Sequence, residues 1–296
     1  TTFFARMLSL NPNLKVASDP FLPVFRSFRT TALRAQVSPE FDSSLPLEDY
    51  YFSANGIQRM HALQGTNLEI HLPEGEWEPL AAALTSRVAL AAKELLEHLG
   101  RLHGETYREV FESGLAMLKH AYGATDGWVG FNDNWVIEFF PQLAEAFPEA
   151  KLLVIVRDPR AAMASAMKLR DNDSSKASKV PLMYSFAHNW RKHAANTYMM
   201  TNHGPFSDRL RVIRYEDVVA DPESELRGIC DFLEVAFEPA MLDTGQFRPM
   251  VGDRWDGHSN FTSETGIYTG SVDAWRRYLP PGTIEFIEFV CDPEME

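Results

Sequence analysis

The chain has 296 residues, of which 45% are hydrophobic, so it can bury a large core as one big α/β domain or as two small ones. Its 28 Lys and Arg residues against 41 Asp and Glu residues give a formal net charge of -13, which argues against a general role on nucleic acid or anionic membranes. Two distant cysteines, Cys230 and Cys291, indicate neither a disulfide framework nor a zinc site, and no apolar run has the length of a transmembrane helix.

The chain opens inside a predicted helix. Apolar positions at helical spacing run through residues 1–10, and Asn11-Pro12-Asn13 ends the helix. Residue 1 is Thr rather than an initiator Met, so we expect further residues upstream of it, where a targeting signal can stand.

Helical periodicity dominates the middle of the N-terminal half. Residues 40–76 are rich in Pro, Ser, Asp and Gly and are typical of loops with short elements. Leu, Ala and Val recur every three or four residues from Trp77 to Leu99 and from Glu105 to Tyr122, which predicts two amphipathic helices. No internal repeat and no clean linker follows, so we favour a single domain over residues 1–296.

A βαβ pattern comes next. The sequence predicts a short strand from Trp128 to Phe131, a helix from Trp135 to Phe147 and a second strand over residues 152–156. The second strand has no polar alternation, so it should be covered on both faces, as in a parallel α/β sheet.

Arg157-Asp158-Pro159-Arg160 ends this strand and opens a small-residue helix that carries Ser165. Asp158 can cap the helix, and Pro159 fits its first turn. A cation at the carboxyl end of a strand, followed by a helix whose first amides are unpaired, suits a phosphate. A plain strand-to-helix turn with a solvated arginine is the alternative for this segment taken alone.

The remaining elements continue the alternation. A polar loop over residues 171–180 leads to a helix from Met183 to about Met200, and residues 210–214 predict the next strand. Tyr215-Glu216-Asp217 ends that strand, and Asp221-Pro222 opens a further helix.

Four short motifs can be picked out along the chain. They are Thr1-Thr2 at a helix start, Arg157-Asp158-Pro159-Arg160 with Ser165 in the following helix, Tyr215-Glu216-Asp217 after a strand, and Ser259 before the segment around Trp275. The set resembles the sulfotransferases that use 3′-phosphoadenosine 5′-phosphosulfate (PAPS), particularly the branch of tyrosylprotein sulfotransferases and bacterial relatives. The resemblance covers nearly the whole chain and implies a P-loop-like three-layer α/β/α fold with a central parallel sheet and a helical insertion. It also implies that both ends are cut, with the family's Gly-rich loop and its Lys or Arg upstream of Thr1.

The resemblance implies most of a nucleotide site. Thr1 and Thr2 would contact the 5′-phosphate through their hydroxyls and the helix amides. Arg157 and Ser165 would hold the 3′-phosphate, because a guanidinium can bind a phosphate bidentately and a hydroxyl adds a neutral donor. Tyr215 would lie beside the nucleotide, with its face suited to adenine and its hydroxyl within reach of the 3′-phosphate.

The C-terminal motif adds two further implied contacts. Ser259 would form a hydrogen bond near the phosphosulfate, and Arg276 or Arg277 would place a cation near the 3′-phosphate. In the family a lysine commonly stands just before the tryptophan, whereas this chain has Ala274 there.

Catalysis needs a base for the acceptor hydroxyl, and positive charge on the sulfuryl group and the leaving phosphate. Asp19 stands where tyrosylprotein-type enzymes place a catalytic glutamate, so the resemblance makes it the base; a turn residue before Pro20 is the alternative. Asn132 stands where relatives often carry a lysine that stabilises the transferring group. An amide donates a hydrogen bond but supplies no charge, so activity would rest on the upstream cation or be reduced.

We therefore expect an enzyme that moves a sulfuryl group from PAPS to an acceptor hydroxyl, or to an amine, without a metal. The expected acceptor is a small molecule, a carbohydrate or a peptide, bound by a helical insertion over residues 30–125, and the expected location is cytoplasmic. Two alternatives stay open: a catalytically impaired PAPS-binding pseudoenzyme, motivated by Asn132, and a P-loop kinase acting on a small molecule.

Overall fold

The computed structural model describes residues 2–42, 55–124, 126–171, 180–247, 261 and 266–295, and for residues 2, 169–171, 180 and 181 it describes the backbone alone. The chain separates into two compact units. Unit 1 comprises Thr1–Ala150, Val235–Met241 and Gln246–Arg254, and unit 2 comprises Lys151–Glu234, Leu242–Gly245 and Trp255–Glu296. The single domain expected over residues 1–296 stays a prediction.

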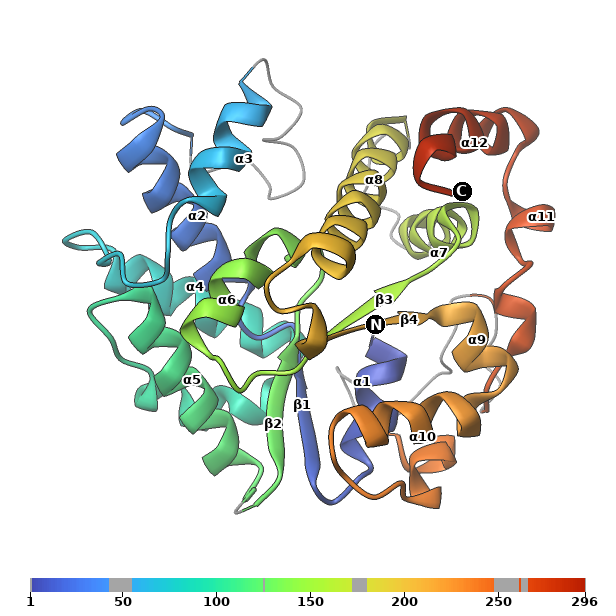
Figure 1. Ribbon diagram of the computed structural model, residues 1–296, viewed down its shortest axis with the longest axis horizontal. Helices are drawn as coiled ribbons and strands as arrows, with labels where there is room; N and C mark the ends of the chain where they lie inside the picture. Colours follow the sequence, from blue (N-terminus) through green and yellow to red (C-terminus); the bar gives the residue numbers. More distant parts are fainter. Residues whose placement is uncertain are drawn as a thin grey trace. The chain divides into compact units, whose positions relative to one another are not determined.

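Unit 1 contains two parallel strands, β1 (Leu14–Ser18) and β2 (Trp128–Asn132), which lie side by side in Figure 1. The register pairs Ser18 with Asn132, so both strands end at the same level. Side chains that directly follow the two strands therefore emerge at the same edge. The sequence predicts β2 but not β1.

Helices make up most of the rest of unit 1. The bounds are α1 (Thr2–Ser9), α2 (Leu22–Gln36), α3 (Gly56–Gln64), α4 (Trp77–Ala91), η2 (Lys93–Arg101), α5 (Tyr107–Ala121), η3 (Ile137–Phe139) and α6 (Phe140–Ala146). The helices predicted over 77–99 and 105–122 are confirmed, except that the first is interrupted at Ala92. With φ -147° and ψ 57°, Ala92 leaves the helical region, and the chain continues as the 3-10 helix η2.

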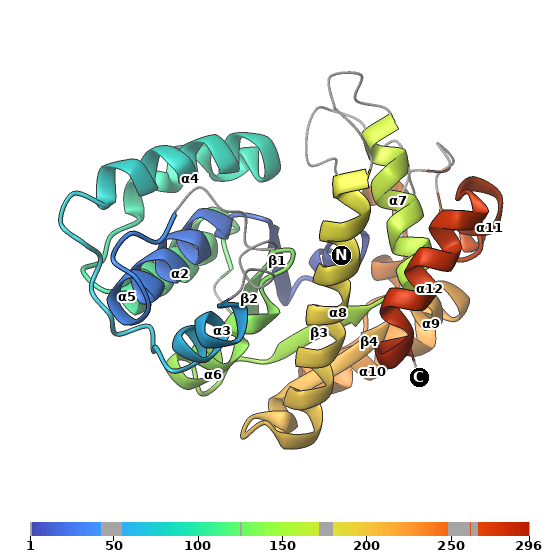
Figure 2. The same cartoon turned by 90° about the horizontal axis from the view of Figure 1, so that it is seen from above.

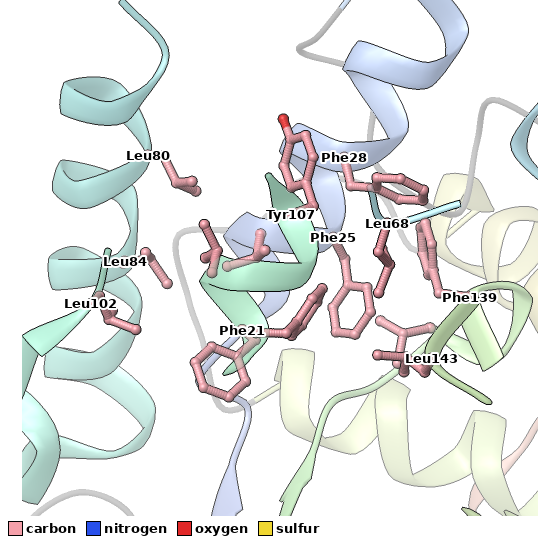
Figure 3. Close-up of a cluster of buried hydrophobic side chains, with 14 of the residues drawn as sticks. Phe21, Phe25, Phe28, Leu68, Leu80, Leu84, Leu102, Tyr107, Phe139 and Leu143 are labelled. Carbon is pink, nitrogen blue, oxygen red and sulfur yellow. The ribbon is translucent and has the colours of Figure 1, made fainter. Parts of the chain in front are cut away.

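The hydrophobic core of unit 1 gathers around one face of α2 (Figure 3). Phe25 packs against Phe111 of α5, with ring centroids 5.0 Å apart, and against Phe139, at 4.9 Å. Phe28, one turn further along α2, packs edge-on against Tyr107 at 5.4 Å. Burial of one such side chain stabilises the fold by about 1.5–3 kcal/mol. The packing fixes the start of α2, which lies just after the end of β1.

Unit 2 is built on a second parallel pair, β3 (Leu152–Val156) and β4 (Leu210–Arg214). Both strands have the bounds that the sequence predicts. Their register pairs Val156 with Arg214, so Arg157 and Tyr215 are the first residues beyond the two carboxyl ends.

The helices of unit 2 are α7 (Pro159–Asp171), α8 (Val180–His203), α9 (Tyr215–Ala220), α10 (Pro222–Phe232), α11 (Trp275–Tyr278) and α12 (Pro281–Met295). Figure 2 shows α12 running alongside α7 and α8. Two ion pairs join these helices, Arg160 with Glu288 and Arg191 with Glu294, both at 2.8 Å. Unit 2 also contains the 3-10 helices η4 (Ser207–Arg209) and η7 (Thr269–Ser271), while the residues of η5 (Pro239–Leu242) and η6 (Thr244–Gln246) are divided between the two units.

Parallel strands flanked by helices confirm the predicted α/β class. Within the described ranges, hydrogen bonds join the strands as two parallel pairs, β1 with β2 and β3 with β4. None of the helices described is both long enough and apolar enough to span a bilayer.

Candidate active site

The carboxyl end of β3 carries a part-buried arginine. The guanidinium carbon of Arg157 lies 4.2 Å from the centroid of the Tyr215 ring. Its Nη2 donates a hydrogen bond to the backbone oxygen of Ser271 at 2.9 Å. On the backbone side, Trp190 Nε1 donates to the Arg157 carbonyl at 2.8 Å. Three other segments of unit 2 therefore hold this residue in place.

The charge of Arg157 has no carboxylate counterion in the described part of the chain, and its Nε, which is buried, has no hydrogen-bond partner there. Burial lowers the pKa of Arg157, while the nearby Tyr215, Glu216 and Asp158 oppose that shift. A guanidinium nevertheless stays charged at neutral pH. A buried donor without an acceptor destabilises a protein by about 1–3 kcal/mol, and an anion that accepts from Nε removes this penalty. Arg157 therefore has the properties of an anion-binding residue.

The neighbouring Arg160 has the opposite environment. It forms a 2.7 Å ion pair with Asp158 and a 2.8 Å ion pair with Glu288, which together raise its pKa. Asp158 also accepts from the backbone N–H of Arg160 at 2.8 Å, and Pro159 occupies the first turn of α7, so the predicted cap is confirmed. Asp158 directs its hydrogen bonds and ion pair to Arg160, and it acts on Arg157 only as a nearby charge.

Tyr215 supports Arg157 from the end of β4. Its hydroxyl lies 2.9 Å from Ser271 Oγ, and Ser271 Oγ donates to the backbone oxygen of Tyr268 at 2.8 Å. With the Ser271 proton used in that bond, the Tyr215 hydroxyl donates to Ser271. The ring and the hydroxyl of Tyr215 thus both have partners inside unit 2, where Arg157 lies over the ring.

A second polar cluster lies at the end of the strands of unit 1. Asp19 follows β1, and its backbone N–H donates to the carbonyl of Asn132 at 2.6 Å. Asp19 is buried and has a left-handed backbone, with φ of +50°. Its Oδ1 accepts hydrogen bonds from the backbone N–H of Asn134 at 3.3 Å and from Asn134 Nδ2 at 3.2 Å.

Arg87 of α4 completes the environment of Asp19. Its Nε donates to the backbone oxygen of Asp19 at 2.9 Å, and its Nη2 lies 3.3 Å from Asp19 Oδ1. Burial raises the pKa of the Asp19 carboxyl, and the Arg87 charge and the Asn134 N–H oppose that rise. A carboxylate with a raised pKa is a stronger base than an ordinary aspartate.

Two buried polar atoms beside Asp19 have no partner among the described residues: Asn132 Nδ2 and Asp133 Oδ1. The other carboxylate oxygen of Asp133 accepts from the backbone N–H of Phe21 at 3.1 Å, at the start of α2. Although Asp133 as a whole residue is half-buried, burial of its carboxyl raises its pKa well above the ordinary value, and the Asp19 charge raises it further.

The structure thus brings the predicted site residues together in two groups. Asp19 and Asn132 meet in unit 1, and Arg157 and Tyr215 meet in unit 2. Ser165 is half-buried in α7. Arg276 is exposed, donates to Asp273 at 3.0 Å and lies over the Trp275 ring at 4.3 Å, so its charge already has a counterion. Thr1 and Ser259 lie outside the described residues, and Thr2 is the first residue of α1.

Sequence reasoning missed Arg87, Asp133, Trp190 and Ser271. Ser271 stands in the segment that carries the fourth motif, so the sequence held a signal for it. Arg87 had none, because it lies 68 residues from Asp19 inside an ordinary amphipathic helix.

Paired parallel strands, with a part-buried arginine after one strand and a buried carboxylate after another, define an α/β protein equipped to bind an anion. A family model described as the sulfotransferase family matches residues 1–239. The chain belongs to the sulfotransferase family, and sulfuryl transfer is the activity of that family.

One solved structure supports the fold. The sulfotransferase domain from the olefin synthase of Synechococcus PCC 7002 is 20% identical in sequence and has a TM-score of 0.53. The match covers 97% of this chain and 89% of that domain. The sulfotransferase domain from the curacin biosynthetic pathway is 19% identical and has a TM-score of 0.48; the match covers 97% of this chain and 92% of that domain. No curated protein matches the chain. Neither the pseudoenzyme nor the kinase alternative gains support from these comparisons.

Proposed function

We propose that this protein transfers the sulfuryl group of PAPS to a hydroxyl of a small-molecule, carbohydrate or peptide acceptor. The observation that carries the proposal is Arg157. A part-buried guanidinium with an unpartnered, buried Nε and no carboxylate counterion in the described chain is suited to a phosphate, which accepts several charge-assisted hydrogen bonds at once.

Arg157 is accordingly the proposed ligand of the 3′-phosphate. Tyr215 and Ser271 position it, because both contact its guanidinium. Ser165 is the proposed second donor to the same phosphate. Proposed nucleotide contacts that rest on the family resemblance are Thr1, Thr2, Ser259 and Arg276.

Asp19 is the proposed general base. Bound PAPS would supply the sulfuryl group and the bisphosphate leaving group. As the acceptor oxygen bonds to sulfur and the bond from sulfur to the phosphate oxygen breaks, the Asp19 carboxylate takes the acceptor proton. Its raised pKa suits this role, since a general base works best when its pKa approaches the working pH. Asn132 is the proposed neutral donor at the end of β2, with an Nδ2 that no described residue uses.

The helices between residues 30 and 125 are the proposed acceptor-binding insertion. This region contributes Arg87 of α4 to the cluster around Asp19, so the helical region and the proposed base belong to one packed unit. An acceptor bound by these helices would therefore lie in the same unit as Asp19, the proposed base.

The first experiment measures nucleotide affinity by titration calorimetry. Arg157→Ala should weaken binding of adenosine 3′,5′-bisphosphate about 10- to 100-fold, because hydrogen bonds to charged groups contribute about 1.5–3 kcal/mol. Its affinity for 5′-AMP, which lacks the 3′-phosphate, should stay within about twofold of wild type. Equal loss for both nucleotides would contradict the assignment of Arg157 to the 3′-phosphate.

Arg227→Ala is the matched control, because Arg227 of the same unit pairs with Glu223 on the exposed face of α10. It should leave both affinities unchanged. Turnover is then tested with labelled PAPS and a broad acceptor panel. A wild-type protein that binds the bisphosphate yet sulfates no acceptor would refute the transfer activity.

A further inference from the structure

The clearest feature that the proposed chemistry leaves unexplained is the contact between α4 and the end of β1. Arg87 reaches Asp19 with two different groups, Nε to the backbone oxygen at 2.9 Å and Nη2 to the carboxylate at 3.3 Å. The side chains are 28% and 8% exposed, so this is no solvated surface pair. The two contacts together are called the Arg87 clamp below.

The clamp acts on a residue whose backbone is unusual. Asp19 has φ of +50°, a left-handed conformation that is uncommon for non-glycine residues, although aspartate adopts it more readily than most. Three contacts fix it: the Arg87 donor on its carbonyl, its own N–H on Asn132, and the Asn134 donors on its carboxylate. Among the described residues, Arg87 alone contacts both the backbone and the carboxylate of Asp19 with a charged group.

The Arg87 clamp also affects the charge of the neighbouring carboxyls. Among the described residues, the charged side chains that act on Asp19 are Arg87 and Asp133, and Asp133 and Asp19 repel one another. Arg87 is the cation that opposes proton uptake by both carboxyls. Without Arg87, the Asp19 carboxyl would stay protonated up to a higher pH. In that range of pH it could not accept a proton from a substrate.

We propose that Arg87 is a positioning residue for sulfuryl transfer: it holds the Asp19 carboxylate in place, and ionised, for proton abstraction. This inference rests on the proposed function, which makes Asp19 the base. Arg87 does not replace the lysine that relatives carry at position 132, because its charge is already shared with Asp19. An arginine suits this role better than a lysine, since a lysine presents one point charge and cannot donate along two directions from a rigid plane.

The test compares Arg87→Gln and Arg87→Lys with wild type by steady-state kinetics. We expect Arg87→Gln to lower kcat about 100-fold, the loss that follows a misplaced catalytic group, with KM for PAPS within about twofold. Arg87→Lys should recover about tenfold of that loss. In the double variant with Asp19→Asn, Arg87→Gln should change kcat less than about twofold, since Arg87 acts through Asp19.

The pH profile separates this role from a merely structural one. Loss of the Arg87 charge raises the pKa of Asp19, so the acid limb of kcat should move to higher pH in Arg87→Gln. Arg227→Gln is the control, because Arg227 pairs with Glu223 at 2.7 Å on the exposed face of α10, outside the residues proposed to bind nucleotide or acceptor. It should leave kcat and the pH profile unchanged.

A titration of the Asp19 carboxyl, followed by carbon-13 NMR in wild type and both Arg87 variants, needs no turnover. An upward shift in Arg87→Gln supports the clamp, and an unshifted titration overturns it. A wild type that transfers no sulfuryl group refutes the proposed function, while this titration still decides on Arg87. If Arg87→Gln does not fold, Arg87→Met, which also lacks the charge, replaces it: an upward shift of the Asp19 titration supports the clamp, and an unshifted titration overturns it. A folded Arg87→Gln with wild-type kcat also overturns the inference and leaves the proposed function intact.

Discussion

Arg157 and Asp19 follow the ends of two strands in different units, and their surroundings are built in opposite ways. Arg157 is a part-buried cation that contacts a ring, a carbonyl oxygen and, in the described chain, no carboxylate. Asp19 is a buried anion that contacts a cation and two amide donors. A cation without a counterion can receive an anionic ligand, whereas a compensated carboxylate keeps its charge for a proton. The difference assigns ligand binding to the first residue and acid-base chemistry to the second.

The largest expected effect is a loss of kcat when Asp19 is replaced. Asp19→Asn keeps the shape of the side chain and removes its basicity, so kcat should fall about 10²- to 10⁴-fold. Bisphosphate affinity should stay within about twofold, because Asp19 is proposed to act on the acceptor proton and is not among the proposed nucleotide contacts. Turnover assays and calorimetry on the same protein check both statements. A variant that binds and turns over like wild type would remove Asp19 from the catalytic group.

The next effect tests the support of Arg157. Ser271→Ala leaves the buried Tyr215 hydroxyl without its acceptor. An unpartnered buried hydroxyl lowers the free energy of unfolding by about 1–3 kcal/mol, which chemical denaturation measures. Bisphosphate affinity should fall as well, since the same loop supplies the carbonyl that accepts from Arg157. A stability equal to that of wild type would show that the Tyr215–Ser271 bond contributes little.

Asp133 offers a test of the unit 1 electrostatics through pH. The pKa of Asp133 is raised in the folded state. Below pH 3.8, the ordinary value, the carboxyl is protonated in both the folded and the unfolded state, so it does not lower the free energy of unfolding there. As pH rises above 3.8, the unfolded chain ionises first, and wild type loses stability until Asp133 ionises in the folded state too. One proton accounts for at most about 1.4 kcal/mol per pH unit. Asp133→Asn should remove this loss, so its thermal stability relative to wild type should increase from pH 4 upward.

The smallest expected effect concerns the Tyr215 hydroxyl. Tyr215→Phe removes the donor and leaves Ser271 Oγ bonded to the Tyr268 carbonyl, so no buried group loses its last partner. The free energy of unfolding should drop by only about 0.5–1.5 kcal/mol, and bisphosphate affinity should change less than about threefold because the ring still faces Arg157. A loss of tenfold or more would mean that the hydroxyl itself binds the nucleotide.

Local sequence signals predicted the elements that local interactions stabilise. Strands β3 and β4 were predicted with their observed bounds, because each is a short run rich in aliphatic residues. The caps of α7 by Asp158 and of α10 by Asp221 follow equally local rules. Strand β1 was missed, since Leu14–Ser18 alternates only weakly and depends on pairing with β2 for its hydrogen bonds.

The same division holds for the candidate site. The sequence by itself determined the strand-end positions of Arg157 and Tyr215, because a strand that ends at a polar residue places that residue at the sheet edge. Tertiary structure alone decided their contact, the absence of a carboxylate on Arg157 in the described chain, and the approach of Arg87 to Asp19 across 68 residues. The physical reason is that charge compensation depends on distances between segments that pack together, and the spacing of residues along the chain does not encode those distances.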